Sequence, residues 1–376
     1  MNLSLTEEQV LMRDTLRSFL ADRYAFDTHR AILESESGWS ANCWRALANE
    51  LGVLGASLPE TLGGSGGNAI DNLVILESMG RSLMVEPYLS TVVIGGGLLS
   101  RLGGALAEAL VPKIVSGEVV IAFAWAEPQG RYELSDLRTT AVRSDGGYLL
   151  CGHKAVVVGA PWATHFVVTA RTSGGERDAE GVSAFLVERD TAGTSLQSYP
   201  TVDGGRAAEL RFDQVRVPAH HLLGEEGQAL PMLERVMDEA IVAVCAEGLG
   251  VMRRMLDETV EYAQQRLQFG KAIASFQVLQ HRMVDMHIAI EQATSLVTVA
   301  TLKLDEPPRE RAQAASAAKV QTGRALRLVG QSAVQIHGGM GVTEELAVGH
   351  FFKRASVIQH QFGSVDHHLR RYAERL

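Results

Sequence analysis

A single glutamate, Glu247, carries the only charge in the run AIVAVCAEGLGVM, which spans residues 240–252. If this run is helical, the neighbours one turn away are all apolar: Ala243, Val244, Gly250 and Val251. A carboxylate in such surroundings loses hydration, and burial favours its protonated form unless a cation or a hydrogen bond compensates the charge. A carboxylate tuned in this way suits removal of a proton from carbon. Glu247 is therefore our candidate for a general base.

Other roles for the acidic residues of this segment stay open. Asp238 and Glu239 lie nearer the expected helix start, where acidic side chains favour the helix dipole, and either is an alternative base. Glu247 is alternatively a structural carboxylate paired with an arginine from another helix, and a further alternative is that the base comes from another chain. The glycines Gly248 and Gly250 predict close packing or room for a ligand, because glycine inside a helix costs about 1 kcal/mol relative to alanine.

The bulk composition is that of a soluble protein with two or three domains. The chain has 376 residues, of which 46% are hydrophobic and 21% are charged. The net charge of −9, without a long basic run, argues against nucleic acid as a partner. Three widely spaced cysteines indicate a reducing compartment, and neither a signal peptide nor an apolar run of about 18 residues is visible. We expect a cytoplasmic protein without a membrane span.

The pattern of apolar residues changes twice along the chain. Residues 1–118 have helical periodicity broken by glycine clusters. Residues 119–227 hold short runs rich in Val, Phe and Ala with turn signals between them, including a hairpin turn at Asp145-Gly146-Gly147. The sequence therefore predicts an α+β multidomain protein that begins with an N-terminal helical domain and continues with a middle β domain, which we expect to be antiparallel and barrel-like.

Helical periodicity returns in residues 228–376. Paired prolines in DEPP (305–308) and the segment QFGKAIAS separate the periodic stretches. With a shorter terminal helix, these stretches predict an antiparallel four-helix bundle, and the long helices are expected at about 229–267, 275–304 and 309–336.

Two segments of this last domain resemble the C-terminal domain of the acyl-CoA dehydrogenases. One segment reads Tyr262-x-x-x-Arg266-x-Gln268-Phe269-Gly270, and the other reads Gln335-Ile336-His337-Gly338-Gly339-Met340-Gly341-Val342-Thr343. Weaker matches in the same order are Pro59-Glu60-x-x-Gly63-Gly64, Glu127-Pro128 and Phe212-x-x-Val215-x-Val217-Pro218. The resemblance implies FAD as cofactor, an acyl-CoA substrate and α,β-dehydrogenation to a 2-enoyl-CoA. It also implies an acceptor like electron-transfer flavoprotein.

The resemblance also assigns roles in a flavin site that lies between subunits. The sequence has no GxGxxG fingerprint after a strand, so FAD must be held differently. Arg266 is expected to bind the diphosphate or adenine end, Phe269 to stack, and the backbone at Gly338 and Gly339 to approach a diphosphate. Further contacts implied by the match are Phe276, Gln277 and Gln335.

The middle domain departs from the family pattern. Val156-Val157-Val158 stands where the family often has Trp-Ile/Leu-Thr or Ser against the flavin ring. Backbone contacts at Val157 and Val158 survive this change, but the indole and the hydroxyl are lost. Trp125, followed by Ala126, either replaces the missing indole wall or packs in the core.

The usual catalytic glutamate of the family is missing. Phe362 occupies its position, and Ala240 occupies the position used by isovaleryl-CoA-type relatives. Glu247 lies seven residues after Ala240, so on a helix it points to the same face about 10 Å further along. The backbone N–H of Phe362 remains able to polarise the thioester carbonyl.

These departures resemble one bacterial branch of the family, in which paired subunits act on steroid side-chain CoA thioesters or on dicarboxylyl-CoA such as pimeloyl-CoA. The stretch Phe352-Lys353-Arg354, in place of Tyr-Arg-Asp, belongs to the same set. We therefore predict a homologous partner subunit in an α2β2 tetramer. Alternatives are a non-catalytic subunit that completes the partner's FAD site and a flavin oxidase or monooxygenase. The histidine pairs at 220–221 and 367–368 lack metal-ligand spacing, and we predict no metal.

Overall fold

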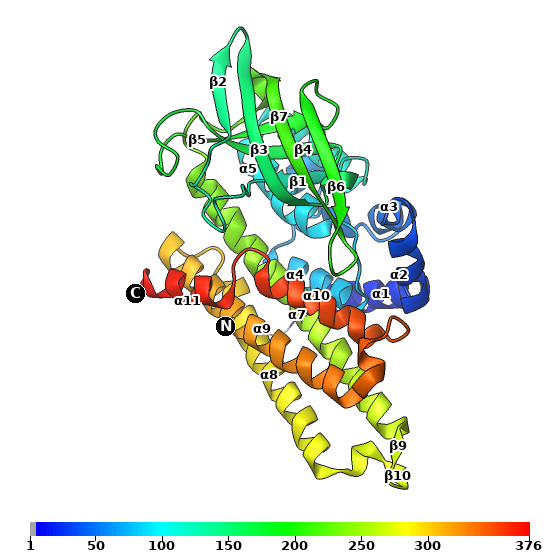
Figure 1. Ribbon diagram of the computed structural model, residues 1–376. Coiled ribbons are helices and arrows are strands. Elements are labelled where there is room, and N and C mark those ends of the chain that lie inside the picture. The colour runs from blue at the N-terminus through cyan, green and yellow to red at the C-terminus, as the bar shows by residue number, and fades with distance from the viewer. Residues whose placement is uncertain (1–4) are drawn as a thin grey trace. The chain divides into compact units, whose positions relative to one another are not determined.

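A computed structural model describes residues 5–376 of the chain (Figure 1). The chain forms two compact units, and each unit is assembled from separate stretches of sequence. The first unit contains the chain up to Ala31 together with Ala69–Met84 and Ile241–Leu376. The second unit contains Ile32–Asn68 and Val85–Ala240.

Helices build the first unit. The expected C-terminal helices are confirmed within two residues at each end, and α8 and α9, yellow and orange in Figure 1, pack side by side. The helices of this unit are α1 (Glu7–Arg23), α4 (Ala69–Arg81), most of α7 (Leu230–Gln265), α8 (Gln277–Leu302), α9 (Pro308–His337), α10 (Ala347–His360) and α11 (Val365–Ala373). Helix α2 (Phe26–Glu34) continues from this unit into the second.

Two glycines let α4 and α7 pack backbone against backbone. A Cβ added at Gly80 would lie 2.2 Å from the carbonyl oxygen of Glu247, and one added at Gly250 would lie 2.0 Å from that of Glu77. At Gly248 an added Cβ would meet Thr322 Cγ2 at 3.1 Å. The alternative that Gly248 and Gly250 leave room for a ligand is therefore wrong, because neighbouring helices occupy that space.

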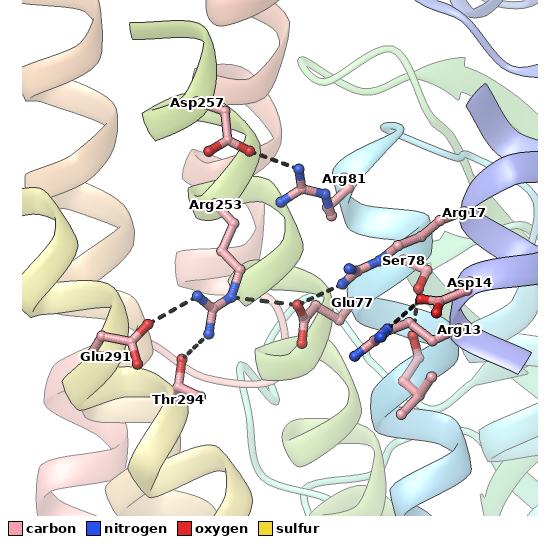
Figure 2. A network of polar contacts seen from close by, with 11 residues as sticks. Arg13, Asp14, Arg17, Glu77, Ser78, Arg81, Arg253, Asp257, Glu291 and Thr294 are labelled. Carbon is pink, nitrogen blue, oxygen red and sulfur yellow. Dashed lines mark hydrogen bonds and ion pairs between the residues drawn. The ribbon is translucent and has the colours of Figure 1, made fainter. Parts of the chain in front are cut away.

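A network of arginines and carboxylates also holds the helices of this unit together (Figure 2). Glu77 on α4 accepts from Arg17 on α1 at 3.1 Å and lies 3.4 Å from Arg253 on α7. Arg253 continues to Glu291 on α8 at 2.9 Å. Each of these charges has an opposite charge within ion-pair distance, so the network connects four helices of this unit.

A mixed eight-stranded sheet builds most of the second unit. Its order is β6-β7-β3-β2-β4-β5-β8, and β1 joins β4 in parallel, so the expectation of a middle β domain is confirmed while the pairing is not antiparallel throughout. The predicted hairpin turn at Asp145 and Gly146 connects β2 to β3. The strands are β1 (Ile121–Ala124), β2 (Thr140–Ser144), β3 (Gly147–Val158), β4 (His165–Arg171), β5 (Val182–Glu188), β6 (Thr194–Pro200), β7 (Arg206–Pro218) and β8 (Leu222–Leu223).

Short helices complete the second unit. They are α3 (Ala41–Asn49), the π-helical η3 (Leu89–Gly96), α5 (Gly97–Leu102) and α6 (Ala105–Val115). The stacked rings of Trp39 and Trp162, with centroids 5.8 Å apart, connect the segment around α3 to the sheet domain within this unit. In the part of the chain from residue 5 onward, none of the helices is long and apolar enough to cross a bilayer.

A buried ion pair lies inside the second unit. Lys154 Nζ donates to Glu127 Oε1 at 2.7 Å and to Thr169 Oγ1 at 3.1 Å, and the side chains of Lys154 and Glu127 are 0% and 2% exposed. Glu127 also accepts the backbone N–H groups of Arg138 and Thr139. Although burial opposes ionisation, the charge of Lys154 and these hydrogen bonds lower the pKa of Glu127 to about 2.

This pair predicts acid sensitivity of the second unit. Because the pKa of Glu127 falls from 4.5 to about 2 on folding, its stabilising contribution is complete above pH 4.5 and is lost as the pH falls towards 2. We expect the free energy of unfolding to drop by about 2–3 kcal/mol from this group between pH 5 and 2.5. All four tryptophans lie in the second unit, so tryptophan fluorescence during urea unfolding reports on it.

The control is the double variant Glu127→Gln/Lys154→Met, which removes both charges together and avoids an unpaired buried ion. It is expected to keep near-native stability at pH 7 and to lose this part of the acid dependence. An unchanged acid dependence in the double variant would assign the effect to other carboxylates.

Candidate active site

Glu247 lies on α7 and faces an arginine of α10. Arg354 Nε donates to Glu247 Oε1 at 2.6 Å, and Arg354 Nη2 donates to Oε2 at 2.8 Å. The Glu247 side chain is 9% exposed and the Arg354 side chain is 21% exposed. This bidentate geometry is the strongest form of an arginine–carboxylate pair.

The pair changes what Glu247 is able to do. Both carboxylate oxygens accept charged hydrogen bonds from Arg354, so the carboxylate is compensated where the sequence suggested that it stands alone. A general base must direct an oxygen at the proton that it removes. The catalytic role of Glu247 therefore stays a prediction that requires Arg354 to withdraw, and the alternative of a structural carboxylate has a matching partner.

The other acidic candidates near the start of α7 are also engaged. Glu239 is paired with Arg101 through two hydrogen bonds of 2.9 Å. Asp238 is 1% exposed and has an interaction partner. Ala240, the position used for the base in isovaleryl-CoA-type relatives, is fully buried.

The segment expected to contact FAD after α7 forms a small projecting hairpin. Strands β9 (Leu267–Gln268) and β10 (Lys271–Ala272) pair in antiparallel fashion, and the two residues between them, Phe269 and Gly270, have φ of 53° and 77°. Two positive φ values in a two-residue turn are typical of a type I′ hairpin, but they are unusual for a bulky side chain. The turn leaves the Phe269 ring 91% exposed.

The predicted ligands around this hairpin face solvent. Arg266 is exposed, and its guanidinium has no hydrogen-bond or ion-pair partner within residues 5–376. Phe276 is half-buried, meets the Phe269 ring edge-on at 6.1 Å, and lies under Lys271 Nζ at 4.5 Å. Gln277 is exposed at the first position of α8. An exposed planar cation and a largely exposed aromatic ring suit a diphosphate and a flat ring system.

The second predicted segment begins where α9 ends. Gly338 has φ of 62° and ψ of −141°, and a Cβ added at Gly338 or at Gly339 meets nothing within 4 Å. The positive φ accounts for glycine at position 338, and the open space beside Gly338 and Gly339 leaves their backbone accessible to a ligand. Gln335, one turn earlier, is exposed.

Tyr262 and His337 bring the two segments to the same end of the bundle. Their rings stack with centroids 4.3 Å apart, and Tyr262 Oη donates to the carbonyl oxygen of His337 at 3.4 Å. This contact joins the last turns of α7 and α9. These residues of the first unit thus fit the binding of an anionic, aromatic cofactor such as FAD.

The predicted flavin contacts of the second unit are only partly available. Trp125 is half-buried and stacks on Phe123 at 6.5 Å, and Ala126 accepts the N–H of Ala155 at 2.8 Å. Val157 is 2% exposed, so its side chain belongs to the core and only its backbone remains for a ligand. Val158 is 46% exposed.

Glu209 shapes this region and was missed from the sequence. The β3–β7 register shifts between Lys154 and Val157, and the bulge gives Val156 a φ of 52°. Glu209 accepts the N–H of Val156 at 3.3 Å and the hydroxyl of Tyr199 at 2.9 Å, and it lies 2.5 Å from His153 Nε2. A bulge fixed by a carboxylate re-aims the valines that follow it.

Two buried lysines were also missed. Lys154 and Lys319 are 0% and 1% exposed, and each donates to groups of its own unit. The sequence carried a signal for Lys319, because it is a lone charge in the small-residue stretch AASAAKVQTG. Among residues 5–376, no group of three or more His, Cys, Asp or Glu side chains is arranged to hold a metal ion.

Comparison with protein families gives matches along almost the whole chain. The model for "Acyl-CoA dehydrogenase, N-terminal domain" matches residues 6–118, that for the middle domain matches 122–215, and that for the C-terminal domain matches 230–376. The three matches follow one another in the order that the sequence predicted.

Individual relatives agree with the family models. The chain is 34% identical to benzylmalonyl-CoA dehydrogenase of Aromatoleum aromaticum over 79% of either chain. It is similar to a chain of the ChsE4-ChsE5 complex from Mycobacterium tuberculosis, with a TM-score of 0.90, 26% identity and coverage of 100% and 98%. It is also similar to the steroid ACAD Tcur3481-Tcur3483, with a TM-score of 0.88, 29% identity and coverage of 98% and 97%.

The exposed aromatic tip generates a binding prediction. Because the Phe269 ring is 91% exposed, with one edge-on contact to Phe276, we expect Phe269→Ala to weaken FAD binding about 2- to 10-fold through loss of stacking, without unfolding the bundle. Flavin absorbance per chain and FAD titration of the cofactor-free complex measure this. The matched control is Leu11→Ala, which removes a 68% exposed apolar side chain from α1. Equal flavin loss in both variants would contradict a specific contact.

Proposed function

The chain belongs to the acyl-CoA dehydrogenase family, and we propose that it works as one subunit of a hetero-oligomer. The family's reaction is the FAD-dependent dehydrogenation of acyl-CoA thioesters. In that reaction bound FAD would supply the acceptor for the hydride of the β-carbon, and a base would remove the α-proton. The proposal concerns which parts of this machinery the present chain supplies and which parts the partner supplies.

One observation carries the proposal: both positions at which the family places its base are occupied by residues that cannot accept a proton. Position 362 is Phe, and position 240 is a buried Ala. Glu247, a buried carboxylate two turns further along α7, is held at both oxygens by Arg354. An assembly made only of this chain would have to break a buried ion pair to obtain a base. A partner chain with its own glutamate avoids that cost.

Exposed apolar side chains on the first unit support association with a partner subunit. Helix α8 exposes Ile288 (47%), Leu296 (36%) and Val299 (44%) within three turns, and Val284 (53%) precedes them. Apolar side chains at this spacing form a stripe along one side of a helix, and such stripes mark protein interfaces. A partner of the same fold fits, because both unlike subunits would then present an equivalent α8.

The proposed substrate is an acyl-CoA with a bulky or dicarboxylic acyl group, such as a steroid side chain. The relatives named for benzylmalonyl-CoA and for steroids support this proposal, and the similarity to a chain of the ChsE4-ChsE5 complex supports pairing of unlike chains. The proposed electron acceptor is a carrier like electron-transfer flavoprotein. The N–H of Phe362, for which residues 5–376 offer no acceptor, is the proposed donor to the thioester carbonyl oxygen, where it makes the α-proton more acidic.

A second candidate role for Glu247 is the base itself. Two features favour this role: Glu247 is buried, and it lies on the same face of α7 as Ala240, two turns further along. Its hydrogen bonds to Arg354 oppose the role. One substitution distinguishes the two roles.

We expect Glu247→Gln in the reconstituted complex to keep its flavin and to lower kcat less than about tenfold, because a structural carboxylate does not touch the reacting atoms. A general base contributes about 10²–10⁴-fold, so a larger loss with flavin retained would make Glu247 the base. The structural role predicts a different signature. The single variant is destabilised by about 3 kcal/mol through the unpaired Arg354, and Glu247→Gln/Arg354→Gln recovers part of that loss.

Assembly is tested by native mass spectrometry of the chain expressed alone and of the chain expressed together with the proposed homologous partner subunit. We expect a complex of unlike chains, with activity only when both are present. Ile288→Lys/Leu296→Lys is expected to weaken the complex by at least tenfold, because it places two charges in an apolar contact. Val142→Lys, at a 63% exposed valine of β2, is the control. A homotetramer with four flavins and full activity would refute the pairing.

A further inference from the structure

The turn after α10 holds its backbone in an unusual conformation. Phe362 has φ of 59° and Gly363 has φ of 129°. Within residues 5–376 the N–H of Phe362 has no hydrogen-bond acceptor, although Gln361 N–H and Gly363 N–H on either side donate to Val357 and His360. A bulky residue in the left-handed region costs free energy and is kept only when its surroundings impose it.

Lys319 of α9 occupies the carbonyls that this N–H would otherwise use. Its ammonium donates to the carbonyl oxygens of Ile358 at 2.7 Å, Gln359 at 3.1 Å and Gly363 at 3.0 Å. A helix commonly ends with a backbone N–H that donates to the carbonyl four residues earlier, which for Phe362 is Ile358. Here a buried lysine satisfies that carbonyl, and the N–H of Phe362 is left over.

A second chain of hydrogen bonds fixes the carbonyl of the same residue. His368 on α11 is fully buried, and burial lowers its pKa to about 2, so the ring is neutral. Its Nε2 lies 3.1 Å from the carbonyl oxygen of Phe362, and its Nδ1 lies 3.3 Å from Ser316 Oγ. The neutral ring therefore carries its proton on Nε2 and donates to Phe362, while Nδ1 accepts from Ser316.

We propose that Lys319 and His368 are positioning residues, which hold the turn so that the N–H of Phe362 is free to donate to the thioester carbonyl oxygen of the substrate. This inference rests on the proposed function, because it takes Phe362 N–H as the carbonyl donor. The lysine binds three carbonyl groups at the end of α10 and in the turn. The histidine orients the peptide unit that follows Phe362. Both side chains are buried and act through the turn.

The test replaces Lys319 by Met, which keeps the length of the side chain and removes all three donors. The probe is oct-2-enoyl-CoA labelled with ¹³C at its carbonyl, bound to the flavin-loaded complex. Its carbonyl stretch, measured by isotope-edited infrared spectroscopy, falls when the oxygen accepts a hydrogen bond. We expect the wild type to lower this frequency and Lys319→Met to return it towards the value in solution. We also expect kcat to fall about 10- to 100-fold with KM nearly unchanged.

Two further variants protect the test against loss of fold. Gly363→Ala would place a methyl group 2.4 Å from His368 Nε2 and disturbs the turn without altering the lysine. It is expected to give the same spectral change. Lys353→Met removes an exposed lysine of α10 that pairs with Glu344, and it is the control that leaves the spectrum unchanged.

The outcomes separate this inference from the proposed function. If the wild-type complex does not lower the carbonyl frequency of this probe, Phe362 N–H is not the donor, and the proposed function loses that element. If the wild type lowers it and folded Lys319→Met and Gly363→Ala lower it equally, the donor stands and the positioning role of Lys319 and His368 is refuted.

Discussion

The ion pair between Glu247 and Arg354 is the constraint around which the helices of the first unit are arranged. It joins the middle of α7 to α10, two helices whose paired residues lie 107 positions apart in the chain. Both charges lose most of their hydration, so each depends on the other, and neither side chain is expendable alone. The same helix segment is fixed from another side by α4, whose Gly80 touches the backbone of Glu247. Any chemistry assigned to Glu247 must be compatible with this double attachment.

Each unit contains buried charges that fix backbone near a predicted site. In the second unit Lys154 and Glu127 lie beside the segment that follows β1, where the carbonyl oxygen of Trp125 is 3.4 Å from Lys154 Nζ. In the first unit Lys319 binds the end of α10, and its partners among residues 5–376 are backbone carbonyls and not carboxylates. Burial lowers the pKa of both lysines to about 8, so both are mainly protonated at neutral pH and use their N–H groups as donors. The two lysines thus hold backbone carbonyls of the segment after β1 and of the end of α10 with the turn that follows it.

The sequence predicted what depends on local pattern. Apolar spacing and paired prolines located α7, α8 and α9, and the Asp145-Gly146 turn located a hairpin, because these signals act over a few residues. The family motifs predicted the solvent-facing residues Arg266, Phe269 and Gly338. The sequence offered an arginine partner for Glu247 only as an alternative and did not identify it, because Arg354 lies 107 positions away on α10 and meets Glu247 only through the packing of the helices. It also left the role of Gly250 open, since the same glycine serves a ligand or a neighbouring helix equally well until the fold places α4 against it.

The hairpin tip at Phe269 has a thermodynamic consequence for the lifetime of this protein. An almost fully exposed phenylalanine ring forgoes about 2 kcal/mol that burial would provide. A cofactor or another polypeptide that covers the ring recovers that free energy. Because it binds only the folded chain, it shifts the unfolding equilibrium towards the folded state. The resistance of the chain to heat and proteolysis should therefore rise with the concentration of its binding partners, and dilution alone should shorten its survival.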